Sequence, residues 1–228
     1  MMVSAVIPAG GKGERMGAGF NKLFLKVGGE EIILRTIAVF DSSPDIDEII
    51  VVAADSDREQ ICEIIKKKDF QTKIVIAEGG ASRQESVYNG LLKASGDISL
   101  IHDGARCLVA HTDIKAVIDG VKECGAAAVG VTVTDTLKHI DDNGNIVSTI
   151  DREKTVHIFT PQGFYTNDII ELHNKAKADG IAVTDDCSIL ESYGRTVRFI
   201  NGSDENIKVT TPKDIELCEE ILRRRNSK

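Results

Sequence analysis

Short apolar runs alternate with segments of helical period along most of this chain, and this alternation restricts the fold more than any other feature. Five runs are rich in β-branched residues and almost continuously apolar: 3–9, 48–53, 73–77, 98–102 and 126–131. Continuous apolar character is typical of strands that are covered on both faces. With helices between the strands and right-handed crossovers, the pattern predicts an α/β fold, in which a Rossmann-like, mostly parallel sheet is flanked by helices.

Start signals for helices lie between these runs. Two pairs of residues fit a capping box, in which a hydroxyl and an acid three residues later satisfy backbone N–H groups: Ser56 with Glu59, and Ser82 with Glu85. Thr112 is expected to open a further helix, and Thr211 to cap a last helix that has Pro212 in its first position. The buried stripes of these two helices are predicted to be Ile114, Val117, Ile118 and Val121, and Ile215, Cys218, Ile221 and Leu222.

The alternation stops between residues 131 and 159. Two β-prone runs, 132–140 and 146–150, flank a polar segment that contains Asn143 and Gly144, a dipeptide that favours a hairpin turn. We therefore expect a β-hairpin arm at about 132–152, within a single domain that spans all 228 residues. An isolated hairpin is only marginally stable in water, so the arm must lie on the body or on another subunit, and we expect a homodimer that forms through it.

Net charge and cysteine spacing argue against several classes of protein. The 28 Lys and Arg residues are outnumbered by 36 Asp and Glu, and the net charge of −8 opposes binding to nucleic acid or to an anionic membrane. The five cysteines are widely spaced, which is typical of reduced thiols rather than a disulfide framework or a zinc site. The apolar run at the N-terminus is shorter than a signal sequence, and no stretch approaches the ~20 apolar residues of a membrane span, so we expect a cytoplasmic protein.

A glycine-rich turn at residues 8–17 directly follows the first predicted strand. Glycine lets the phosphates of a ligand approach backbone N–H groups closely. The turn is not a Walker A loop, because Lys12 is followed by glycine, and it is not a dinucleotide fingerprint, because Met16 stands where the third glycine belongs. Lys12, Arg15 and Lys22 lie within eleven residues, which favours an anion site over the alternative of an ordinary flexible turn.

The glycine spacing of this turn, together with Arg15, Met16 and Lys22, resembles the signature loop of sugar nucleotidyltransferases, which couple a nucleoside triphosphate to a sugar or polyol phosphate. Further segments narrow the resemblance to the family of 2-C-methyl-D-erythritol 4-phosphate cytidylyltransferases, enzymes of non-mevalonate isoprenoid biosynthesis. These segments are 79–87, 102–106, 135–138, 160–162, 184–186 and 206–210. Any one of them alone is weak evidence, but they occur in family order between Pro8 and about Asp214, and the ordered set is highly specific.

The resemblance implies transfer of CMP from CTP to 2-C-methyl-D-erythritol 4-phosphate, with Mg²⁺ present and pyrophosphate released. It implies that the catalytic cations are Arg15, Lys22, Arg152 and Lys208. The residues expected to contact the nucleotide are Ala9, Gly10, Gly11, Gly80, Ser86 and Gly104. Those expected to contact the polyol phosphate are Asp103, Arg106, Thr136, Arg152 and Thr184. Asp103 is also the candidate metal ligand, since Mg²⁺ is commonly held by phosphates, water and one or two carboxylates.

The chemistry of the reaction explains why cations are expected as the catalytic groups. Charge builds up on a pentacoordinate phosphorus, and positive side chains stabilise it. The attacking phosphate is mostly dianionic at neutral pH, because its second pKa is about 6, so no general base is required. His102, His139 and His157 are therefore expected to be structural. By resemblance, Arg152 reaches the active site of the other subunit; the alternative is a surface ion pair with Asp151 or Glu153.

The chain departs from the family pattern at five positions. Asn21 and Cys107 stand for prolines, Gly10 and Gly104 for alanines, and Ala81 for an acidic residue. The departures at 21 and 81 are expected to loosen the first loop or to change nucleotide affinity, whereas every proposed catalytic cation is present.

Two alternative functions stay open. A D-ribitol-5-phosphate cytidylyltransferase shares the first loop and the lysine motif, although segments 83–87, 135–138 and 160–164 favour the methylerythritol enzyme. A CTP-binding module without catalysis is the other alternative, and the presence of Arg15, Lys22 and Lys208 argues against it.

Overall fold

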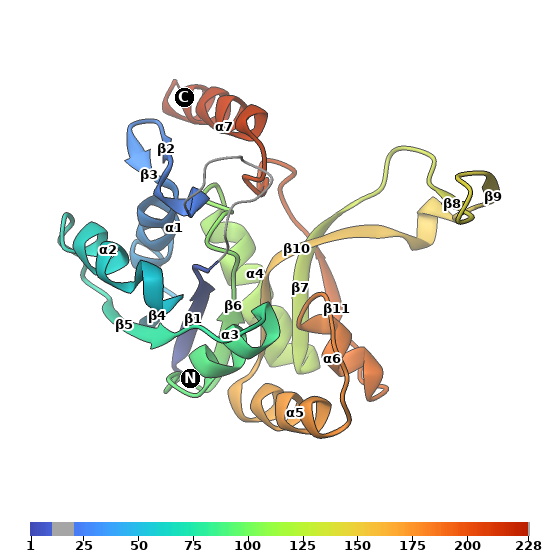
Figure 1. Ribbon diagram of the computed structural model, residues 1–228, viewed down its shortest axis with the longest axis horizontal. Helices are drawn as coiled ribbons and strands as arrows, with labels where there is room; N and C mark the ends of the chain where they lie inside the picture. Colours follow the sequence, from blue (N-terminus) through green and yellow to red (C-terminus); the bar gives the residue numbers. More distant parts are fainter. Residues whose placement is uncertain (11–20, 228) are drawn as a thin grey trace.

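One central sheet organises the molecule, for which a computed structural model describes residues 1–10 and 21–227. Seven strands lie in the order β11-β7-β10-β6-β1-β4-β5 (Figure 1). Their bounds are β1 (Val3–Pro8), β4 (Glu48–Ala53), β5 (Lys73–Glu78), β6 (Ile98–Ile101), β7 (Ala126–Thr132), β10 (Val156–Tyr165) and β11 (Arg198–Asn201). β1 runs parallel to β4 and β6, β4 to β5, and β7 to β11. The predicted α/β fold with a mostly parallel sheet is confirmed.

The five strands expected from apolar runs all exist, within a residue or two of the predicted bounds. β10 and β11 were not among them. β10 runs antiparallel to both β6 and β7 and therefore lies between two strands that sequence order would have made neighbours. Its sequence contains Pro161 and Gly163, which weaken a local strand pattern, and the pairing with β7 shifts register between Ile158 and Gln162, where the proline is accommodated.

Helices cover both faces of the sheet and bury two apolar cores. One core includes side chains of α1 (Ile32–Asp41), α2 (Asp55–Ile65), α4 (His111–Cys124) and α7 (Pro212–Asn226). The other includes side chains of α3 (Arg83–Leu91), α5 (Thr166–Ala178) and α6 (Cys187–Ser192). Along β1, Ala5 and Ile7 enter the first core and Val6 the second, as the alternation of side chains in a strand requires.

Two of the four predicted helix starts are correct. Ser82 caps α3 by accepting a hydrogen bond from the backbone N–H of Glu85, and Thr211 caps α7 in a capping box with Pro212 in the first turn. The other two predictions, at Ser56 and Thr112, are wrong. α2 and α4 begin one residue earlier than those hydroxyls, and backbone carbonyls of Ala54 and Ala110 accept the first-turn N–H groups instead.

The buried stripes of α4 and α7 agree with the sequence pattern. All four predicted residues of α4 are buried; in α7 Cys218 and Ile221 are buried, while Ile215 and Leu222 pack partly buried against the same core. The five cysteines, all within the described ranges, are free thiols. Among the described residues, no helix combines the length and apolar character that crossing a membrane would need.

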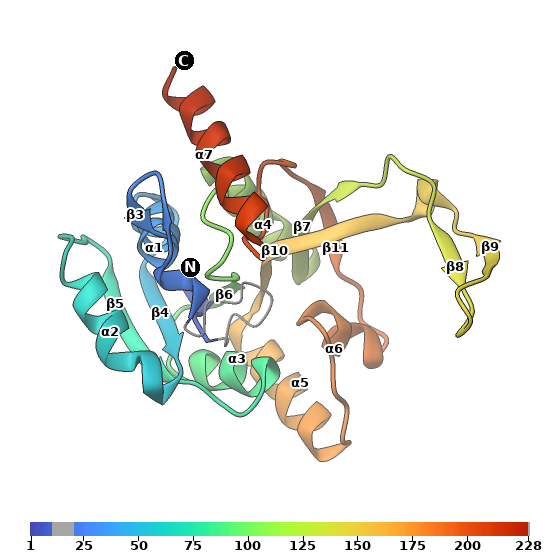
Figure 2. The same ribbon diagram turned by 45° about the horizontal axis from the view of Figure 1, so that its top comes forward.

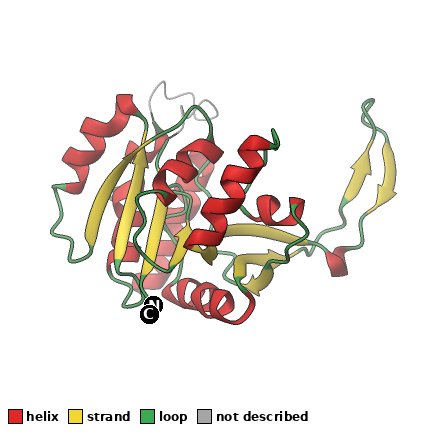
Figure 3. Cartoon of the chain, turned by 90° about the horizontal axis from the view of Figure 1, so that it is seen from below, coloured by secondary structure: helices red, strands yellow, loops and turns green. Residues whose placement is uncertain are grey.

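The predicted hairpin arm is present and projects from the sheet (Figures 1, 2 and 3). β8 (Lys138–Ile140) pairs antiparallel with β9 (Ile146–Thr149), and Gly144 turns the chain with a φ of +82°. The short helix η3 (Arg152–Lys154) follows, just before β10. Ile140, Ile146 and Val147 of the arm are about two-thirds exposed, at 65%, 68% and 65%. The arm therefore does not lie on the body of its own chain.

Candidate active site

Polar side chains gather where β1 and β6 end. Ala9 directly follows β1, Asp103 lies two residues beyond β6, and the N–H of Gly104 donates to the carbonyl of Pro8 at 3.3 Å, which joins the two strand ends. The carboxyl ends of parallel strands are where open α/β sheets hold their ligands. The predicted site residues after β1 and β6 thus share one edge of the sheet.

Three cations surround one carboxylate at this edge, and we call Arg83, Asp103, Arg106 and Lys208 the Asp103 cluster. Lys208 Nζ lies 2.8 Å from Asp103 Oδ2, Arg106 Nε lies 3.6 Å from the same oxygen, and Arg83 Nη2 lies 3.6 Å from Oδ1. The carboxylate is only 12% exposed. Burial raises the pKa of Asp103, but the cations outweigh it and lower the pKa to about 2. Asp103 is ionised throughout the physiological range.

Arg106 is fixed from several directions. Its Nη1 donates to the carbonyl of Asn206 at 2.7 Å, and its guanidinium lies over the ring of Phe159, 4.6 Å from the centroid. Asn206 in turn donates its amide to the carbonyl of Thr160 at 2.8 Å. The segment that leads to Lys208 is thereby held against β10 and the loop after β6. Three distant parts of the chain meet at the predicted substrate arginine.

Arg83 joins the cluster to a second buried acid that the sequence analysis did not single out. Arg83 is the first residue of α3, and its Nη1 lies 2.9 Å from Asp186 Oδ2. Asp186 is fully buried, and its backbone N–H donates to Gln162 Oε1 at 3.1 Å. Arg83, Gln162 and Asp186 all lie inside segments that carry the family resemblance. Position in those motifs was the only sequence signal for them, because Arg83 and Asp186 are far apart in the chain.

His102 is structural, as expected. The ring is fully buried; Nε2 lies 3.0 Å from the carbonyl oxygen of Arg106, and Nδ1 lies 3.2 Å from the hydroxyl of Thr160. Burial lowers the pKa of His102 to about 4, so the ring is neutral at neutral pH. The histidine connects the loop after β6 with β10 and does not serve as a base.

Asn21, the first described residue after the glycine-rich segment, is fixed by hydrogen bonds. Its amide nitrogen donates to the carbonyl of Ala9 at 2.7 Å and to Asp57 at 2.8 Å, and its Oδ1 caps the helix η2 (Lys22–Phe24). Asn21 is 5% exposed and held by these bonds, while residues 11–20 of the loop that it is expected to loosen lie outside the described residues, so that expectation stays a prediction. These bonds place Lys22 near the end of β1. Gly11 and Arg15, two predicted site residues, lie outside the described residues.

Gly80 and Ser86 are brought together on the other side of β1. The Gly80 N–H donates to Ser86 Oγ at 2.9 Å, and that hydroxyl donates to the carbonyl of Ser82 at 2.8 Å. A Cβ atom on Gly80 would stand 2.3 Å from Glu85 Cγ, so only glycine fits there without movement of Glu85. A Cβ atom on Gly104 would stand 3.1–3.2 Å from its nearest neighbours. This close approach is consistent with glycine at a position where the family usually has alanine.

The remaining predicted residues lie apart from the Asp103 cluster. Arg152 and Thr136 belong to the arm, where Arg152 Nη1 donates to the carbonyl of Thr134 at 3.0 Å. The arm extends away from the ends of β1 and β6 (Figure 2). Thr184 is exposed, on the segment that leads to the buried Asp186. Within one chain the structure therefore assembles Asp103, Arg106 and Lys208, but not Arg152 or Thr136.

Comparisons with known proteins cover almost the whole chain. The model of a family described as 2-C-methyl-D-erythritol 4-phosphate cytidylyltransferase matches residues 3–224. A protein of that name from Desulforamulus reducens is 40% identical over 98% of this chain and 97% of its own, and one from Syntrophotalea carbinolica is 43% identical over 97% of each.

Solved structures agree. A 4-diphosphocytidyl-2C-methyl-D-erythritol synthase from Anaerococcus prevotii superposes with a TM-score of 0.87 at 30% identity, over 98% of this chain and 96% of that one. A 2-C-methyl-D-erythritol 4-phosphate cytidylyltransferase from Thermus thermophilus gives a TM-score of 0.80 at 31% identity, over 98% of this chain and 100% of that one.

Proposed function

Because the chain belongs to the family of 2-C-methyl-D-erythritol 4-phosphate cytidylyltransferases, we propose that it transfers the cytidylyl group of CTP to 2-C-methyl-D-erythritol 4-phosphate. A phosphate oxygen of the polyol attacks the α-phosphorus of CTP, the bond from that phosphorus to the β-phosphate oxygen breaks, and pyrophosphate leaves. The protein is thus a nucleotidyltransferase of isoprenoid biosynthesis.

The Asp103 cluster is the observation that carries this proposal. Three cations converge on one carboxylate at the ligand-binding edge of the sheet, and Lys208 is 39% exposed, so its ammonium can exchange Asp103 for a phosphate oxygen. Arg106 offers a planar guanidinium of the kind that binds phosphate through two nitrogens. A site with an excess of positive charge suits a triphosphate and a phosphate monoester that must approach each other.

No side chain needs to remove a proton from the nucleophile. The phosphate of the polyol is mostly dianionic at neutral pH. The buried His102, with its pKa of about 4 and both ring nitrogens occupied, is unsuited to proton transfer. Catalysis in this site is therefore the placement of two anionic reactants and the stabilisation of charge on the α-phosphorus.

The other site residues keep their proposed roles. Arg15 and Lys22 of the first loop neutralise the triphosphate, together with Lys208. The residues proposed to surround the base and ribose are Ala9, Gly10, Gly11, Gly80, Ser86 and Gly104. The Gly80 N–H already donates to the Ser86 hydroxyl, so a base that binds this N–H must turn that hydroxyl away. Thr184, with Asp103 and Arg106, is proposed to bind the polyol.

We further propose a homodimer in which the arm of one subunit completes the site of the other. Three large apolar side chains of the arm are about two-thirds exposed, and an isolated hairpin is unstable in water. Arg152 and Thr136 lie on this arm, away from the Asp103 cluster of their own chain. Docked on a partner, the arm would bury its apolar side chains and place Arg152 near the partner's polyol phosphate.

Mg²⁺ is proposed to enter with CTP, bound to its phosphates. Among the described residues no three carboxylate, histidine or cysteine side chains are grouped to hold a metal ion. Both oxygens of Asp103 face cations, which does not fit a carboxylate that anchors a metal directly. The metal role of Asp103 stays a prediction.

Pyrophosphate release from MgCTP tests the proposal. We expect turnover with 2-C-methyl-D-erythritol 4-phosphate and little with D-ribitol 5-phosphate, each offered separately. Turnover with ribitol 5-phosphate alone would assign the other polyol, and CTP binding without turnover would overturn the enzymatic function. The cytoplasmic location is likewise a proposal, and cell fractionation tests it.

A further inference from the structure

Arg83 differs from the other two cations of the Asp103 cluster, because a second carboxylate matches its charge. Its Nη1 lies 2.9 Å from Asp186 Oδ2, and its Nη2 lies 3.6 Å from Asp103 Oδ1. In the described part of the chain, Lys208 and Arg106 form ion pairs with Asp103 alone. The proposed function uses Lys208 and Arg106 for the substrates and gives Arg83 no role.

Asp186 is placed so that it retains Arg83. Its carboxylate is buried, and a carboxylate that has lost its hydration needs a nearby cation. His173 Nε2 is farther away than Arg83, at 3.5 Å from Asp186 Oδ1. Burial lowers the pKa of Arg83, but the charges of Asp186 and Asp103 outweigh it and raise that pKa, so the guanidinium stays charged.

A glutamine of the central sheet fixes the position of Asp186. The backbone N–H groups of Asp186 and Cys187 donate to Gln162 Oε1 at 3.1 Å and 3.3 Å, and Gln162 Nε2 donates to Asp185 Oδ2 at 2.8 Å. Gln162 is buried and belongs to β10, the strand beside β6. It therefore holds both the buried acid and the segment just before it, which contains Thr184.

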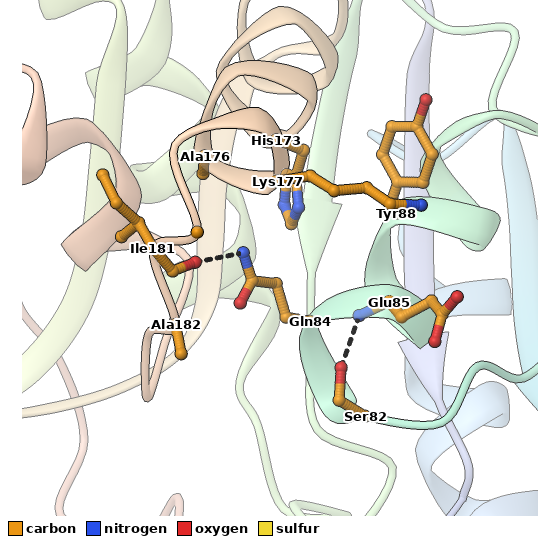
Figure 4. Close-up of a pocket in the computed structure, with 10 residues that line it drawn as sticks. Ser82, Gln84, Glu85, Tyr88, His173, Ala176, Lys177, Ile181 and Ala182 are labelled. Atoms are coloured by element: carbon orange, nitrogen blue, oxygen red, sulfur yellow. Dashed lines mark hydrogen bonds between the residues drawn. The ribbon is translucent and has the colours of Figure 1, made fainter.

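The start of α3 is tied to the same segment. Gln84 Nε2 donates to the carbonyl of Ile181 at 3.3 Å, a bond drawn in Figure 4, and the N–H of Val183 donates to Gln84 Oε1 at 3.4 Å. Arg83 directly precedes this glutamine on α3. The guanidinium thus leaves a helix end that is already bound to the segment carrying Asp186.

We propose that Arg83, held by Asp186, is a positioning residue that keeps the Asp103 carboxylate charged and in place for the polyol. This role rests on the proposed function, in which Lys208 leaves Asp103 for a phosphate oxygen. Asp103 is only 12% exposed and would then lose its closest cation. Arg83 cannot follow the phosphate, because Asp186 holds its other nitrogen. One oxygen of Asp103 therefore keeps a cationic neighbour, and the carboxylate can accept hydrogen bonds from the polyol hydroxyls.

The effect of this arrangement should fall on the polyol rather than on CTP. Asp103 and Thr184 are the proposed polyol contacts, and the bonds described above fix the positions of both. The hydrogen bond between Gly80 and Ser86, which shapes the proposed base site, does not use the Arg83 side chain. Loss of the Arg83 charge should therefore raise KM for the polyol phosphate and leave KM for CTP unchanged. General loss of structure would not separate the two values.

Initial rates of pyrophosphate release, with each substrate varied in turn, test the proposal. Arg83→Gln should raise KM for 2-C-methyl-D-erythritol 4-phosphate about ten-fold, a value within the range for directly coupled residues. KM for CTP and kcat should each change less than about two-fold. Arg195→Gln removes an arginine from an exposed ion pair with Asp168, 3.1 Å long and outside the site, and should change none of the three values. Calorimetric titration with MgCTP checks that each variant is folded.

Double variants show whether Arg83 acts through its two carboxylates. Asp186→Asn alone should raise the polyol KM about ten-fold, and its combination with Arg83→Gln should raise it no further, whereas independent contributions would multiply to about 100-fold. In an Asp103→Asn background, Arg83→Gln should change this KM less than about two-fold. Should Arg83→Gln leave the buried carboxylate unpaired and unfold the protein, the combination with Asp186→Asn removes that charge and provides a folded form.

The possible outcomes separate this role from the proposed function. An unchanged polyol KM in Arg83→Gln, an equal rise of both KM values, or multiplication of the effects in either double variant would overturn the role of Arg83, while turnover by the native protein would leave the proposed function intact. Absence of turnover by the native protein would overturn the proposed function and the role of Arg83 together.

Discussion

Replacement of Asp103 by asparagine tests whether this carboxylate organises the three cations around it. The variant keeps the size of the side chain and removes its charge. In the native protein the pKa of Asp103 is lowered from 3.8 to about 2. At about 1.4 kcal/mol for each pKa unit, the charged form contributes about 2 kcal/mol to the free energy of unfolding at pH 7. Because the side chain is only 12% exposed, solvent screening reduces this value little.

The sign of the pH dependence follows from the direction of the shift. A carboxyl group with a lowered pKa in the folded state stabilises the protein fully above its unfolded pKa, here near 4, and loses this contribution as pH falls toward 2. The difference between the native protein and Asp103→Asn should therefore be about 2 kcal/mol at pH 7 and roughly half of that at pH 3.

Urea unfolding of both proteins at pH 7 and pH 3 measures this difference. Asp69→Asn, which removes an exposed carboxylate that pairs with no cation of the described residues, serves as the matched control and should leave stability unchanged. Equal stability of Asp103→Asn and the native protein at pH 7 would refute the reasoning. So would a difference that stays constant between pH 7 and pH 3, because it would not arise from ionisation.

Three further predictions concern the reaction and the dimer. Lys22→Ala should lower kcat by a factor of about 100 or more in the pyrophosphate assay, and little change in rate would remove Lys22 from catalysis. Arg152→Ala should mainly raise KM for the polyol phosphate; mixing it with Lys22→Ala subunits should restore about a quarter of native activity, and no recovery would contradict a site shared between subunits. Ile146→Asp should shift the protein to a monomer in size-exclusion chromatography, whereas Leu217→Asp, at an exposed position outside the arm, should not.

The local sequence pattern was sufficient to predict a structural element wherever one segment determines its own structure. Five strands were predictable because short, continuously apolar runs rich in β-branched residues are typical of strands covered on both faces. The hairpin arm was predictable because Asn143 and Gly144 favour the turn. Helix starts were less certain: at Ser56 and Thr112 a suitable hydroxyl exists, but each helix begins one residue earlier, and the carbonyls of Ala54 and Ala110 accept the N–H groups of Asp57 and Asp113.

For the candidate site, the sequence predicted individual residues, at strand ends and in the ordered motifs, but not how these residues pair with one another. Asp103 and Arg106 follow a strand, so their place at the ligand edge could be inferred from sequence. The partnership of Arg83 with Asp186 could not, since these residues are 103 positions apart and neither has a local feature that selects the other. Asn21 also shows this limit, because its anchoring bonds reach Ala9 and Asp57.

The sequence by itself determined which segments become strands, the presence of the arm and the chemistry that the motifs can supply, because these depend on neighbours along the chain. Only the tertiary structure decided that β10 inserts antiparallel between β6 and β7, that three cations meet on Asp103, and that the arm stands away from its own body. Such contacts depend on the order of strands in the sheet and on burial shared by distant segments, and no local pattern encodes either.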